Sequence, residues 1–450
     1  MFDPDWDAAT RETVECLSRL IQAETTNPPG NEERAVKVIQ DILEREEVPP
    51  GDCHILESAP GRVNLVVRLR GDGSHRPLLM SGHTDVVPVE REHWTHNPFG
   101  GEVFDGCVWG RGALDMKGFL AMYLQAFLLA RRLKLPLKRD LVLAAVADEE
   151  AGFRYGSRFL VDQHRNLIDA EYGVTEGGAM TMYAGKVRFY PIQVAEKGMC
   201  WIRMTAKGEP GHGSIPIADN AVLHLAEALE RIRCGRHLPV HLTPTFQAMV
   251  RSVSAQLKFP LNLVPGLLRS PVVARMILNL LPAESRAMLA VMITNTVTPT
   301  MLRAGVKANV VPSAAEATLD CRRLPGQSVE DVMREITATT GDQVTLEPLH
   351  VSAGAAFPVD SPFYRVLETA ARQMDPGGLV VPFLMPGGTD ASEYQRAGIQ
   401  MYGFTPGVLP PDFPFMTMAH GHDERLPIAF IRSGLPVLWE VLQAACVRPQ

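Results

Sequence analysis

Imidazole and carboxylate side chains follow several short apolar runs of the chain, and these are groups that bind metal ions. In chain order the donors are His83, Asp85, Asp115, Glu149, Glu150 and Glu176. The runs at 77–82 and 140–147 are predicted to be buried strands. Ligands of open α/β sheets lie beyond the carboxyl ends of parallel strands, so these donors are expected to converge. Zinc accepts both types of ligand, and the pattern indicates a two-metal hydrolase.

Charge balance and spacing suggest how such a site is built. Asp115, Glu150 and Glu176 together with one hydroxide carry four negative charges, which two Zn²⁺ would neutralise, making burial tolerable. One carboxylate must bridge two metals lying ~3.5–4 Å apart. Asp115 lies between Gly112 and Gly118, where the backbone can approach closely, and is predicted to be close to both metals.

The remaining two carboxylates are expected to act without binding metal. Asp85 is two residues from His83, on the same side of an extended chain, and is placed to hold the other imidazole nitrogen. Glu149 and Glu150 are adjacent and should point in opposite directions. One can bind metal while the other faces the attacking water as a proton shuttle.

Composition narrows the class of protein. A chain of 450 residues is too long for one core, which predicts two domains. The net charge of −7 argues against a nucleic-acid partner. Seven cysteines without C-x-x-C spacing favour reduced thiols, and the acidic N-terminus is not a signal peptide. No apolar run approaches the roughly 20 residues that span a bilayer. A cytoplasmic protein without a membrane span is expected.

The order of predicted elements indicates one domain inserted into another. Strands and helices alternate over 1–192, which favours an α/β fold with a mostly parallel sheet between layers of helices. Residues 193–352 read as β-α-β-β-α-β, a ferredoxin-like α+β unit. A long apolar segment at 241–300 interrupts that unit. Helix–strand alternation resumes over 353–450, which is predicted to complete the first domain.

Several segments, taken in order, resemble the family of aminoacylases, glutamate carboxypeptidases and succinyl-diaminopimelate desuccinylases. They are residues 81–88 (SGHTDVVP), 110–118 (GRGALDMKG), 148–150 (DEE), 210–214 (PGHGS), 309–312 (NVVP), 320–322 (DCR), 386–390 (PGGTD) and 420–424 (HGHDE). The likeness covers nearly the whole chain. The apolar segment 241–300 is similar to the lid extension of the carboxypeptidase S and fatty-acyl amino-acid hydrolase branch.

The resemblance implies a role for each matching metal ligand. His83 and Glu176 would complete one zinc site, Glu150 and His420 the other, with Asp115 bridging. Glu149 would be the general base and then the general acid. Co²⁺ or Mn²⁺ could substitute, since carboxylate-rich sites accept them. The family often has a cis peptide after the bridging aspartate, here Asp115–Met116.

The resemblance also implies substrate contacts from the inserted domain, which acts as a lid in this family. His212, in some relatives supplied by a partner subunit, would polarise the scissile carbonyl. Asn309 and Arg322 would hold the substrate, with Arg322 on its carboxylate. Gly388 and Thr389 would line the substrate site. A homodimer formed through the lid is implied in the same way.

Three alternatives stay open from the sequence. His420 and His422 compete for one ligand position, and the spacing His-x-x-Asp-Glu favours His420. Arg322 can instead pair with Asp320 or Glu316. The segment 241–300 can form an acyl-chain pocket, pack on the lid or bury a dimer surface.

The resulting hypothesis is a dizinc amide hydrolase that uses metal-bound hydroxide and Glu149 as general base. It would release an amino acid with a free carboxylate from an N-acyl amino acid or a C-terminal peptide bond. The rival within enzymes is a dipeptidase of broad specificity. A non-catalytic receptor for small carboxylates is disfavoured because a binder has no need of Glu149.

Overall fold

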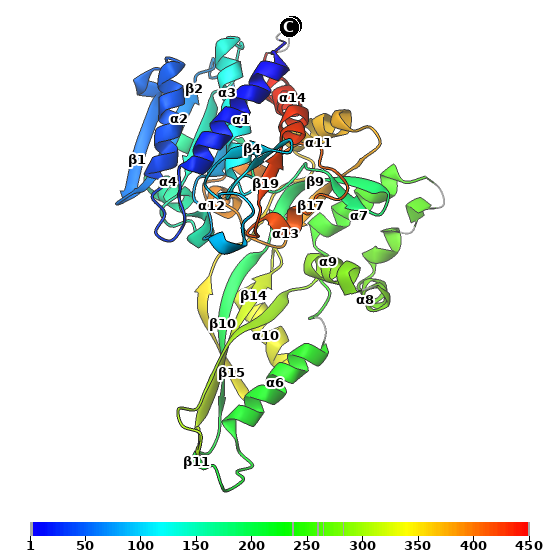
Figure 1. Cartoon of the computed structure of the whole chain (residues 1–450). Coiled ribbons are helices and arrows are strands. Elements are labelled where there is room, and N and C mark those ends of the chain that lie inside the picture. Colours follow the sequence, from blue (N-terminus) through cyan, green and yellow to red (C-terminus); the bar gives the residue numbers. More distant parts are fainter. Residues whose placement is uncertain (1–2, 236–237, 259–260, 264, 282, 449–450) are drawn as a thin grey trace. The chain divides into compact units, whose positions relative to one another are not determined.

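The computed structural model describes the whole chain except residues 1–2, 236–237, 259–260, 264, 282 and 449–450 (Figure 1). The chain divides into two compact units. Unit 1 comprises residues 1–194, 357–382 and 389–450, and unit 2 comprises residues 195–356 and 383–388. A segment inserted between two parts of unit 1 therefore forms most of unit 2.

Unit 1 contains the larger sheet and most of the long helices. Its helices are α1 (Trp6–Gln22), α2 (Glu33–Arg45), α3 (Lys117–Arg132), α4 (Ser157–Gln163), α5 (Arg165–Ile168), α11 (Pro362–Met374), α12 (Ala391–Arg396), α13 (Phe415–Met418) and α14 (Ile428–Cys446). Its strands are β1 (Cys53–Ala59), β2 (Arg62–Leu69), β3 (Leu78–His83), β4 (Glu102–Phe104), β5 (Cys107–Trp109), β6 (Leu141–Val146), β7 (Tyr172–Thr175), β8 (Met182–Ala184), β18 (Gln400–Gly403) and β19 (Arg425–Pro427). Strands β9 (Val187–Glu196) and β17 (Leu379–Met385) run across the boundaries between the units.

The large sheet has the strand order β1-β2-β6-β3-β7-β18-β9-β16, with β8 and β17 also paired to β9. Its central strands β6, β3, β7 and β18 are parallel, whereas β1 and β2 on one side and β9 on the other pair antiparallel. The expected α/β class with a mostly parallel central sheet is confirmed. Because β3, β6 and β7 run in the same direction, their carboxyl ends lie at one edge.

Helices cover the sheet, and the strands β3, β6 and β7 are buried along their whole length. Helix α3 packs against β3 and β6 and is covered in turn by α1 and α14, while α12 packs against β18 and α4. By length and composition α14 could cross a bilayer, and it is the only such helix in the described part of the chain. However, 56% of that stretch is buried inside the fold, as in a core helix.

Unit 2 is built on a four-stranded antiparallel sheet. The strands of unit 2, in this sheet and outside it, are β10 (Gly198–Lys207), β11 (Gly211–His212), β12 (Thr296–Ala304), β13 (Val310–Val311), β14 (Ala314–Arg323), β15 (Val344–Val351) and β16 (Ala355–Ala356). Its helices are α6 (Ala221–Gly235), α7 (Pro244–Gln256), α8 (Pro271–Leu280), α9 (Ala283–Ile293) and α10 (Val329–Thr340). The order β12-β14-β10-β15, with α6 and α10 packed through Leu225, Val332 and Ile336, is ferredoxin-like.

The segment 241–300 forms a small helical layer between α6 and β12. Helices α7, α8 and α9, with the short 3₁₀ turns η4 (Leu261–Leu263) and η5 (Pro265–Arg269), make up this layer. It has its own core, which includes Phe246, Val250, Leu278 and Ile293. Phe259, an apolar residue of this segment, lies outside the described residues.

Candidate metal centre

The predicted donors of unit 1 meet at the carboxyl edge of the parallel strands. His83 ends β3, Glu176 directly follows β7, and Glu149 and Glu150 lie in the 3₁₀ turn η3 (Glu149–Ala151) after β6. Asp115 lies in the loop before α3. His420 comes from the loop between α13 and β19, a segment far away in the sequence.

The carboxylate of Asp115 lies between two imidazoles. Its Oδ1 is 3.1 Å from His83 Nε2, and its Oδ2 is 3.1 Å from His420 Nε2. Glu150 Oε2 is 3.1 Å from His420 Nε2, and Glu176 Oε2 is 3.6 Å from His83 Nε2. Each oxygen of Asp115 thus faces one imidazole, and each imidazole also faces a glutamate. This is the arrangement that a carboxylate bridging two cations requires.

Glu149 and Glu150 face different parts of the cluster. Donor atoms of Glu149, His83 and Glu176 lie within 4.8 Å of one another, and so do those of Glu150, His83 and Asp115. Both glutamates lie in a sharp turn, because the residues on either side of it, Asp148 and Gly152, have positive φ angles of 65° and 114°. As a result, two adjacent carboxylates can serve two different positions.

The loop that carries Asp115 is held by the buried carboxylate of Glu424. This carboxylate accepts hydrogen bonds from the backbone N–H groups of Gly112 (3.0 Å), Leu114 (2.7 Å) and Asp115 (3.0 Å). The guanidinium of Arg111 donates to it at 2.7 Å. Glu424 was given no role from the sequence. The one feature that pointed to it was its place at the end of the run 420–424 (HGHDE), which resembles a family motif.

Close packing explains the glycines around Asp115. Gly112 has a φ of +87°, which side chains rarely adopt. A Cβ on Gly118 would lie 2.2 Å from the carbonyl oxygen of Ala113. The peptide between Asp115 and Met116 is cis, as predicted.

Asp85 lies against the second imidazole nitrogen of His83 and also contacts the turn after β6. His83 Nδ1 lies 3.0 Å from the backbone oxygen of Asp85 and 3.5 Å from its carboxylate. The carboxylate also accepts the backbone N–H groups of Glu149 (3.1 Å) and Glu150 (3.2 Å). It also accepts a hydrogen bond from the amide of Asn27 at 2.8 Å. Asp85 therefore joins the strand that carries His83 to the turn that carries both glutamates.

A buried ion-pair network supports that turn from behind, and sequence analysis missed it. Arg62 pairs with Glu32 at 2.6 Å and with Asp148 at 2.8 Å. Asn27 donates to Asp148 as well, at 3.2 Å. Asn27 begins the Asn-Pro-Pro-Gly turn at 27–30, which precedes α2. Nothing local reveals that its side chain reaches a loop more than a hundred residues away.

Charges in the cluster favour a bound cation. Burial, reinforced by the charge of Glu176, raises the pKa of Glu149 well above its ordinary value. Burial likewise raises the pKa of Glu176 to about 8. Hydrogen bonds to Asp115 and Glu150 raise the pKa of His420 to about 10. Divalent cations would relieve this crowding of negative charge, and imidazole and carboxylate donors at these distances fit them.

The structure separates the two candidate histidines of the run 420–424. His420 faces Asp115 and Glu150, as described above. His422 lies 3.6 Å from Glu90 and packs against the ring of His93, with 5.1 Å between ring centroids. Of the two, His420 is the one that reaches the cluster.

Asp390 is a further buried carboxylate that sequence analysis did not assign. Ser157 donates to its Oδ1 at 2.5 Å, and its Oδ2 has no hydrogen-bond partner among the described residues. Burial raises the pKa of Asp390 to about 7. Its charge also contributes to the raised pKa of Glu149.

The predicted substrate-binding residues of unit 2 fall into two places. His212 and Asn309 are neighbours, because β11 pairs with β13 and the N–H of Gly213 donates to the oxygen of Asn309 at 2.9 Å. His212 is exposed, and its Nδ1 lies 2.7 Å from Ser214 Oγ. Arg322 pairs with Asp320 through two contacts of 2.8 and 3.1 Å, which was the alternative left open.

The last two predicted residues lie where the chain returns to unit 1. Gly388 is exposed, whereas Thr389 is buried. Thr389 Oγ1 accepts the backbone N–H of Ala391 at 3.1 Å, at the start of α12. This contact gives the hydroxyl of Thr389 a structural partner near Asp390.

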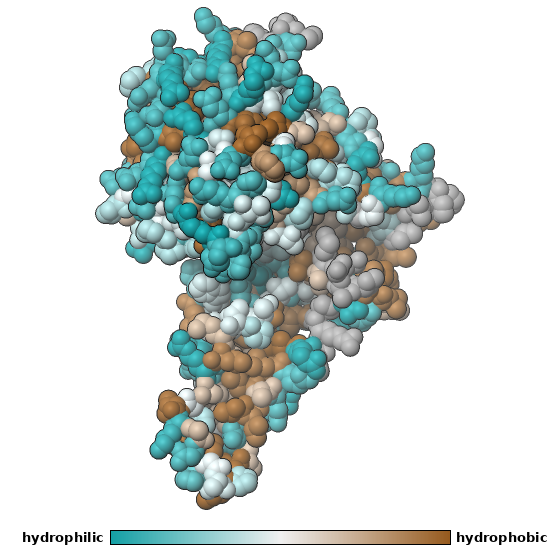
Figure 2. Space-filling view, viewed as in Figure 1, coloured by the Kyte–Doolittle hydropathy of each residue, from teal (hydrophilic) through white to brown (hydrophobic). Residues whose placement is uncertain are grey.

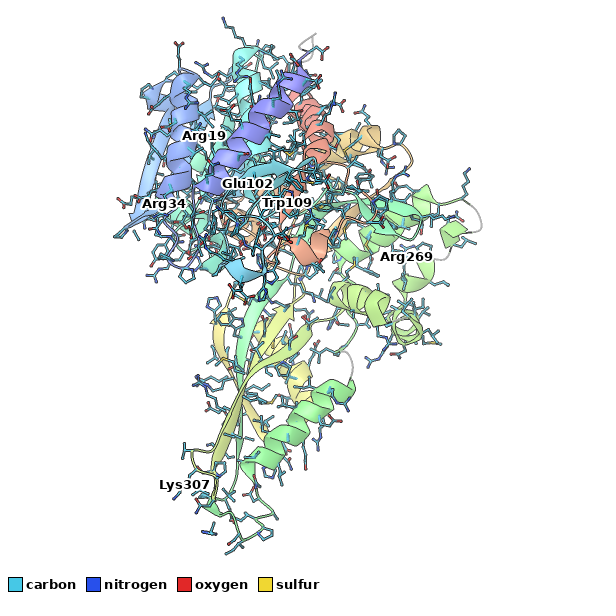
Figure 3. All side chains as sticks on the ribbon, in the orientation of Figure 1. Arg19, Arg34, Glu102, Trp109, Arg269 and Lys307 are labelled. Carbon is cyan, nitrogen blue, oxygen red and sulfur yellow. The ribbon has the colours of Figure 1, made fainter. Side chains whose placement is uncertain are left out.

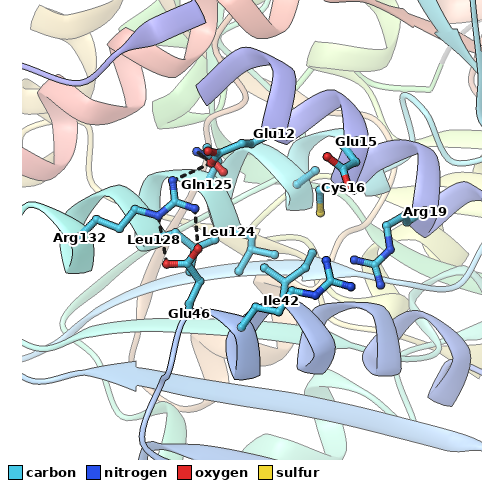
Figure 4. A pocket seen from close by; sticks show the side chains of 12 residues that line it. Glu12, Glu15, Cys16, Arg19, Ile42, Glu46, Leu124, Gln125, Leu128 and Arg132 are labelled. Atoms are coloured by element: carbon cyan, nitrogen blue, oxygen red, sulfur yellow. Dashed lines mark hydrogen bonds and ion pairs between the residues drawn. The ribbon is translucent and has the colours of Figure 1, made fainter. Parts of the chain in front are cut away.

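A separate pocket of about 130 Å³ lies among α1, α2 and α3 (Figure 4). Arg132 crosses it and pairs with Glu12 at 2.7 Å and with Glu46 at 2.6 Å. None of the predicted site residues lines it. The carboxylates of Glu12 and Glu46 are thus paired with a guanidinium, which distinguishes them from the crowded carboxylates of the metal centre.

Comparison with known proteins agrees with this geometry. The sequence matches the family described as "Peptidase family M20/M25/M40" over residues 79–444. It is 29% identical to aminoacylase-1 of Sus scrofa, with 97% of this chain and 96% of the relative covered. It is 28% identical to the N-fatty-acyl-amino acid synthase/hydrolase PM20D1 of Xenopus tropicalis, with 87% and 74% covered. An M20 family metallo-carboxypeptidase of Sulfolobus solfataricus superposes with a TM-score of 0.69 at 17% identity, covering 96% of this chain and 99% of the other.

Proposed function

Because the chain belongs to the peptidase family M20/M25/M40, we propose that it is a two-metal hydrolase of N-acyl amino acids or C-terminal peptide bonds. The product would be an amino acid with a free carboxylate. The observation that carries the proposal is the carboxylate of Asp115, whose two oxygens each lie 3.1 Å from a different imidazole. Glu149 lies beside this centre with a raised pKa.

Five side chains would hold the two cations. His83 and Glu176 would bind one ion, Glu150 and His420 the other, and Asp115 both. When bound, zinc or another divalent cation would polarise the scissile carbonyl and lower the pKa of a water molecule from 15.7 to about 7. Zinc is the proposed ion because imidazole and carboxylate donors suit it, and cobalt or manganese are alternatives.

Glu149 is the proposed proton carrier. Its carboxylate would accept a proton from the attacking water and return it to the leaving nitrogen. Asp85 would keep Glu149 in place through the backbone N–H that it accepts at 3.1 Å. A general base of this kind contributes about 10²–10⁴-fold to the rate of proton-coupled steps.

Residues outside the metal centre would orient the substrate. His212 is proposed to polarise the scissile carbonyl, and Asn309, its neighbour across β11 and β13, to bind the substrate. Gly388 and Thr389 would line the same site. Arg322 is proposed to bind the substrate carboxylate. For that, its guanidinium must share or release Asp320, since both groups are now paired.

The test of Glu149 separates an enzyme from a receptor. Glu149→Gln should keep both metals, which elemental analysis would show, and lower kcat by about 10²-fold or more. Glu92→Gln, at an exposed glutamate in the 3₁₀ turn at 91–93, is the matched control and should leave kcat unchanged. An unchanged rate in Glu149→Gln would refute the proposed proton carrier. A wild-type protein that binds small carboxylates without turnover would instead be a receptor.

A substrate panel separates the deacylase from a dipeptidase of broad specificity. N-acyl derivatives of leucine and glutamate with acyl chains of rising length would be compared with dipeptides of the same residues. A higher kcat/KM for acyl substrates supports the deacylase, and a preference for dipeptides supports its rival. A variant in which the segment 241–300 is shortened would show whether any dependence on acyl-chain length comes from that segment. Val240 and Thr294 form a β-bridge at its base, so the chain can be rejoined there.

Cellular location and assembly are part of the proposal. A cytoplasmic protein is supported by six free cysteines among the described residues, for example Cys16 and Cys321. A homodimer through the lid is proposed from the family resemblance. Light scattering of the purified chain would measure its mass, and a monomer at micromolar concentration would contradict the dimer.

A further inference from the structure

The helical layer inserted in unit 2 exposes large apolar side chains. They are Leu263 (62% exposed), Leu267 (55%), Val272 (70%), Met276 (60%) and Leu280 (82%). The first two lie in η4 and η5, which contact each other, and η5 also contacts α8, which carries the other three. Together with the exposed Lys258, Arg269 and Arg275, we name these residues the insertion patch. Brown apolar atoms are visible in Figure 2 where Figure 1 places α8.

Helix α8 is apolar on two faces, and only one of them serves its fold. Ala274 and Leu278 point inward, to a core shared with Phe246 and Val250. Val272, Met276 and Leu280 follow each other at intervals of four residues, so they share a second face, which is exposed. A helix at the surface of a soluble domain needs one apolar stripe. The second stripe therefore has no role in the core of the layer.

The second face of α8 is held in a fixed shape. The side chain of Ser270 caps the start of α8. At the other end, Arg286 donates to the backbone oxygens of Leu278 (3.1 Å) and Leu281 (2.9 Å). Backbone groups at both ends of the helix thus have hydrogen-bond partners, and the exposed Met276 and Leu280 play no part in these bonds. The apolar face is a preformed surface of a defined helix.

The charge of this layer is opposite to that of the chain as a whole. Residues 241–300 contain five basic residues and one acidic residue, whereas the full chain has a net charge of −7. Lys258, Arg269 and Arg275 are exposed, and Figure 3 labels Arg269 on this layer. Arg275 lies beside Met276 on the outer face of α8. Apolar side chains bordered by basic ones match a surface of acyl chains and anionic headgroups.

We propose that the insertion patch docks on an anionic lipid bilayer, with α8 lying in the plane of the membrane interface. A second copy of the chain fits the patch less well, since it would bring the basic residues of two copies together. Docking does not depend on the proposed function. Its consequence does: an amide hydrolase held at a bilayer would meet amphiphilic acyl substrates where they partition.

Sedimentation of the full chain with lipid vesicles tests this proposal. One set of vesicles is phosphatidylcholine alone, and the other contains about a third phosphatidylserine. We expect binding to the anionic vesicles that weakens as salt rises. The double variant Met276→Ser/Leu280→Ser should bind at least tenfold more weakly. Arg269→Gln/Arg275→Gln should lose the preference for phosphatidylserine.

Matched controls show whether the location of the apolar residues matters. Leu302→Ser/Val306→Ser changes two exposed apolar residues of unit 2 outside the inserted layer, which are 65% and 101% exposed. This variant should bind vesicles as the wild type does. The thermal midpoint of every variant would be measured, and because all these side chains are exposed, it should stay unchanged.

Three results would overturn the proposal. They are absence of binding to anionic vesicles, equal binding by the Met276→Ser/Leu280→Ser variant, and equal binding to both kinds of vesicle. If the patch variants instead shift the mass of the chain in light scattering and vesicle binding is absent, the patch joins two copies of the chain. All these measurements are made without turnover. A failed docking test and a failed test of amide hydrolysis are therefore distinguishable.

Discussion

Glu424 is the residue on which the shape of the Asp115 loop most depends. Its buried carboxylate accepts hydrogen bonds from three backbone N–H groups of that loop and from the guanidinium of Arg111. The loop has no regular secondary structure, and the hydrogen bonds that its N–H groups donate to one carboxylate hold it in place. The position of Asp115 between two imidazoles is therefore supported by a side chain outside the proposed set of metal ligands.

Replacement of Glu424 should cost stability. Glu424→Ala leaves the guanidinium of Arg111, which is 2% exposed, without its carboxylate. We expect the free energy of unfolding to fall by about 3–5 kcal/mol, the usual cost of breaking a buried pair. Urea denaturation measures the change, with Glu92→Ala as the exposed control. A loss below about 1 kcal/mol would show that the loop does not depend on this carboxylate.

Lys197 should make the stability of unit 2 depend on pH. Its ammonium is buried, donates to the backbone oxygen of Thr294 at 2.8 Å, and has a pKa lowered by burial from 10.5 to about 7. Between these values the unfolded chain binds a proton that the folded chain does not. Stability therefore rises with pH across this window, by about 2 kcal/mol from pH 7 to pH 9.

The variant Lys197→Met isolates this effect. It has no titrating group at this position. The free energy of unfolding of the wild type should therefore rise relative to that of the variant between pH 7 and pH 9. Urea midpoints of both proteins at several pH values provide the measurement. A difference that stays constant over the window would show that the folded-state pKa of Lys197 is ordinary. Lys207→Met, at an exposed lysine of β10, is the control.

At the scale of elements, strand ends and tight turns position the centre. The parallel strands β3, β6 and β7 end at one edge, and a donor lies at the end of β3 or directly after β6 and β7. The turn after β6 is closed by two positive φ angles, and the loop before α3 is packed tightly around Gly118. The sheet gives the donors a common location, and the turns give each donor its direction.

Gly118→Ala should disturb the loop that carries Asp115. The added methyl group would lie 2.2 Å from the backbone oxygen of Ala113, which cannot move without displacing Asp115. We expect weaker metal binding, by at least tenfold in titration calorimetry, together with a lower thermal midpoint. Gly51→Ala is the control, because a Cβ there meets nothing within 4 Å. Equal metal affinity in both variants would contradict the proposed role of this packing.

At the scale of the whole molecule, metal binding should be linked to folding. Five donors from five separate segments of unit 1 meet at the centre, and their carboxylates repel one another without a cation. A ligand at 100 times its Kd stabilises the folded state by about 2.7 kcal/mol. We expect a chelator to lower the thermal midpoint and Zn²⁺ or Co²⁺ to restore it.

Variants of the two neighbouring histidines, His420 and His422, provide a control for the chelation experiment. His420→Ala removes one proposed ligand of one ion, so its thermal midpoint should respond less to added metal than that of the wild type. His422→Ala removes the neighbouring histidine, which faces Glu90, and should respond as the wild type does. A similar response of both variants would remove His420 from the proposed ligand set.

Local patterns of residues were enough to predict the fold class, the family and the kinds of donor. Alternation of apolar runs and helices is a local property, and strands that are buried on both faces must be apolar throughout. Donors that directly follow such strands are recognisable for the same reason. The predicted cis peptide at Asp115–Met116 was found as well, through family likeness of a short motif.

The three-dimensional structure was needed to show which side chains meet across long stretches of chain. It brought His420 rather than His422 to Asp115, paired Arg322 with Asp320, and turned the carboxylate of Asp85 toward the turn at 149–150. It also revealed Asn27, Arg62 and Glu424 as supports of the centre. Such contacts depend on the directions in which turns and loops return to the sheet. Those directions result from packing of the whole unit, and no local pattern of residues encodes them.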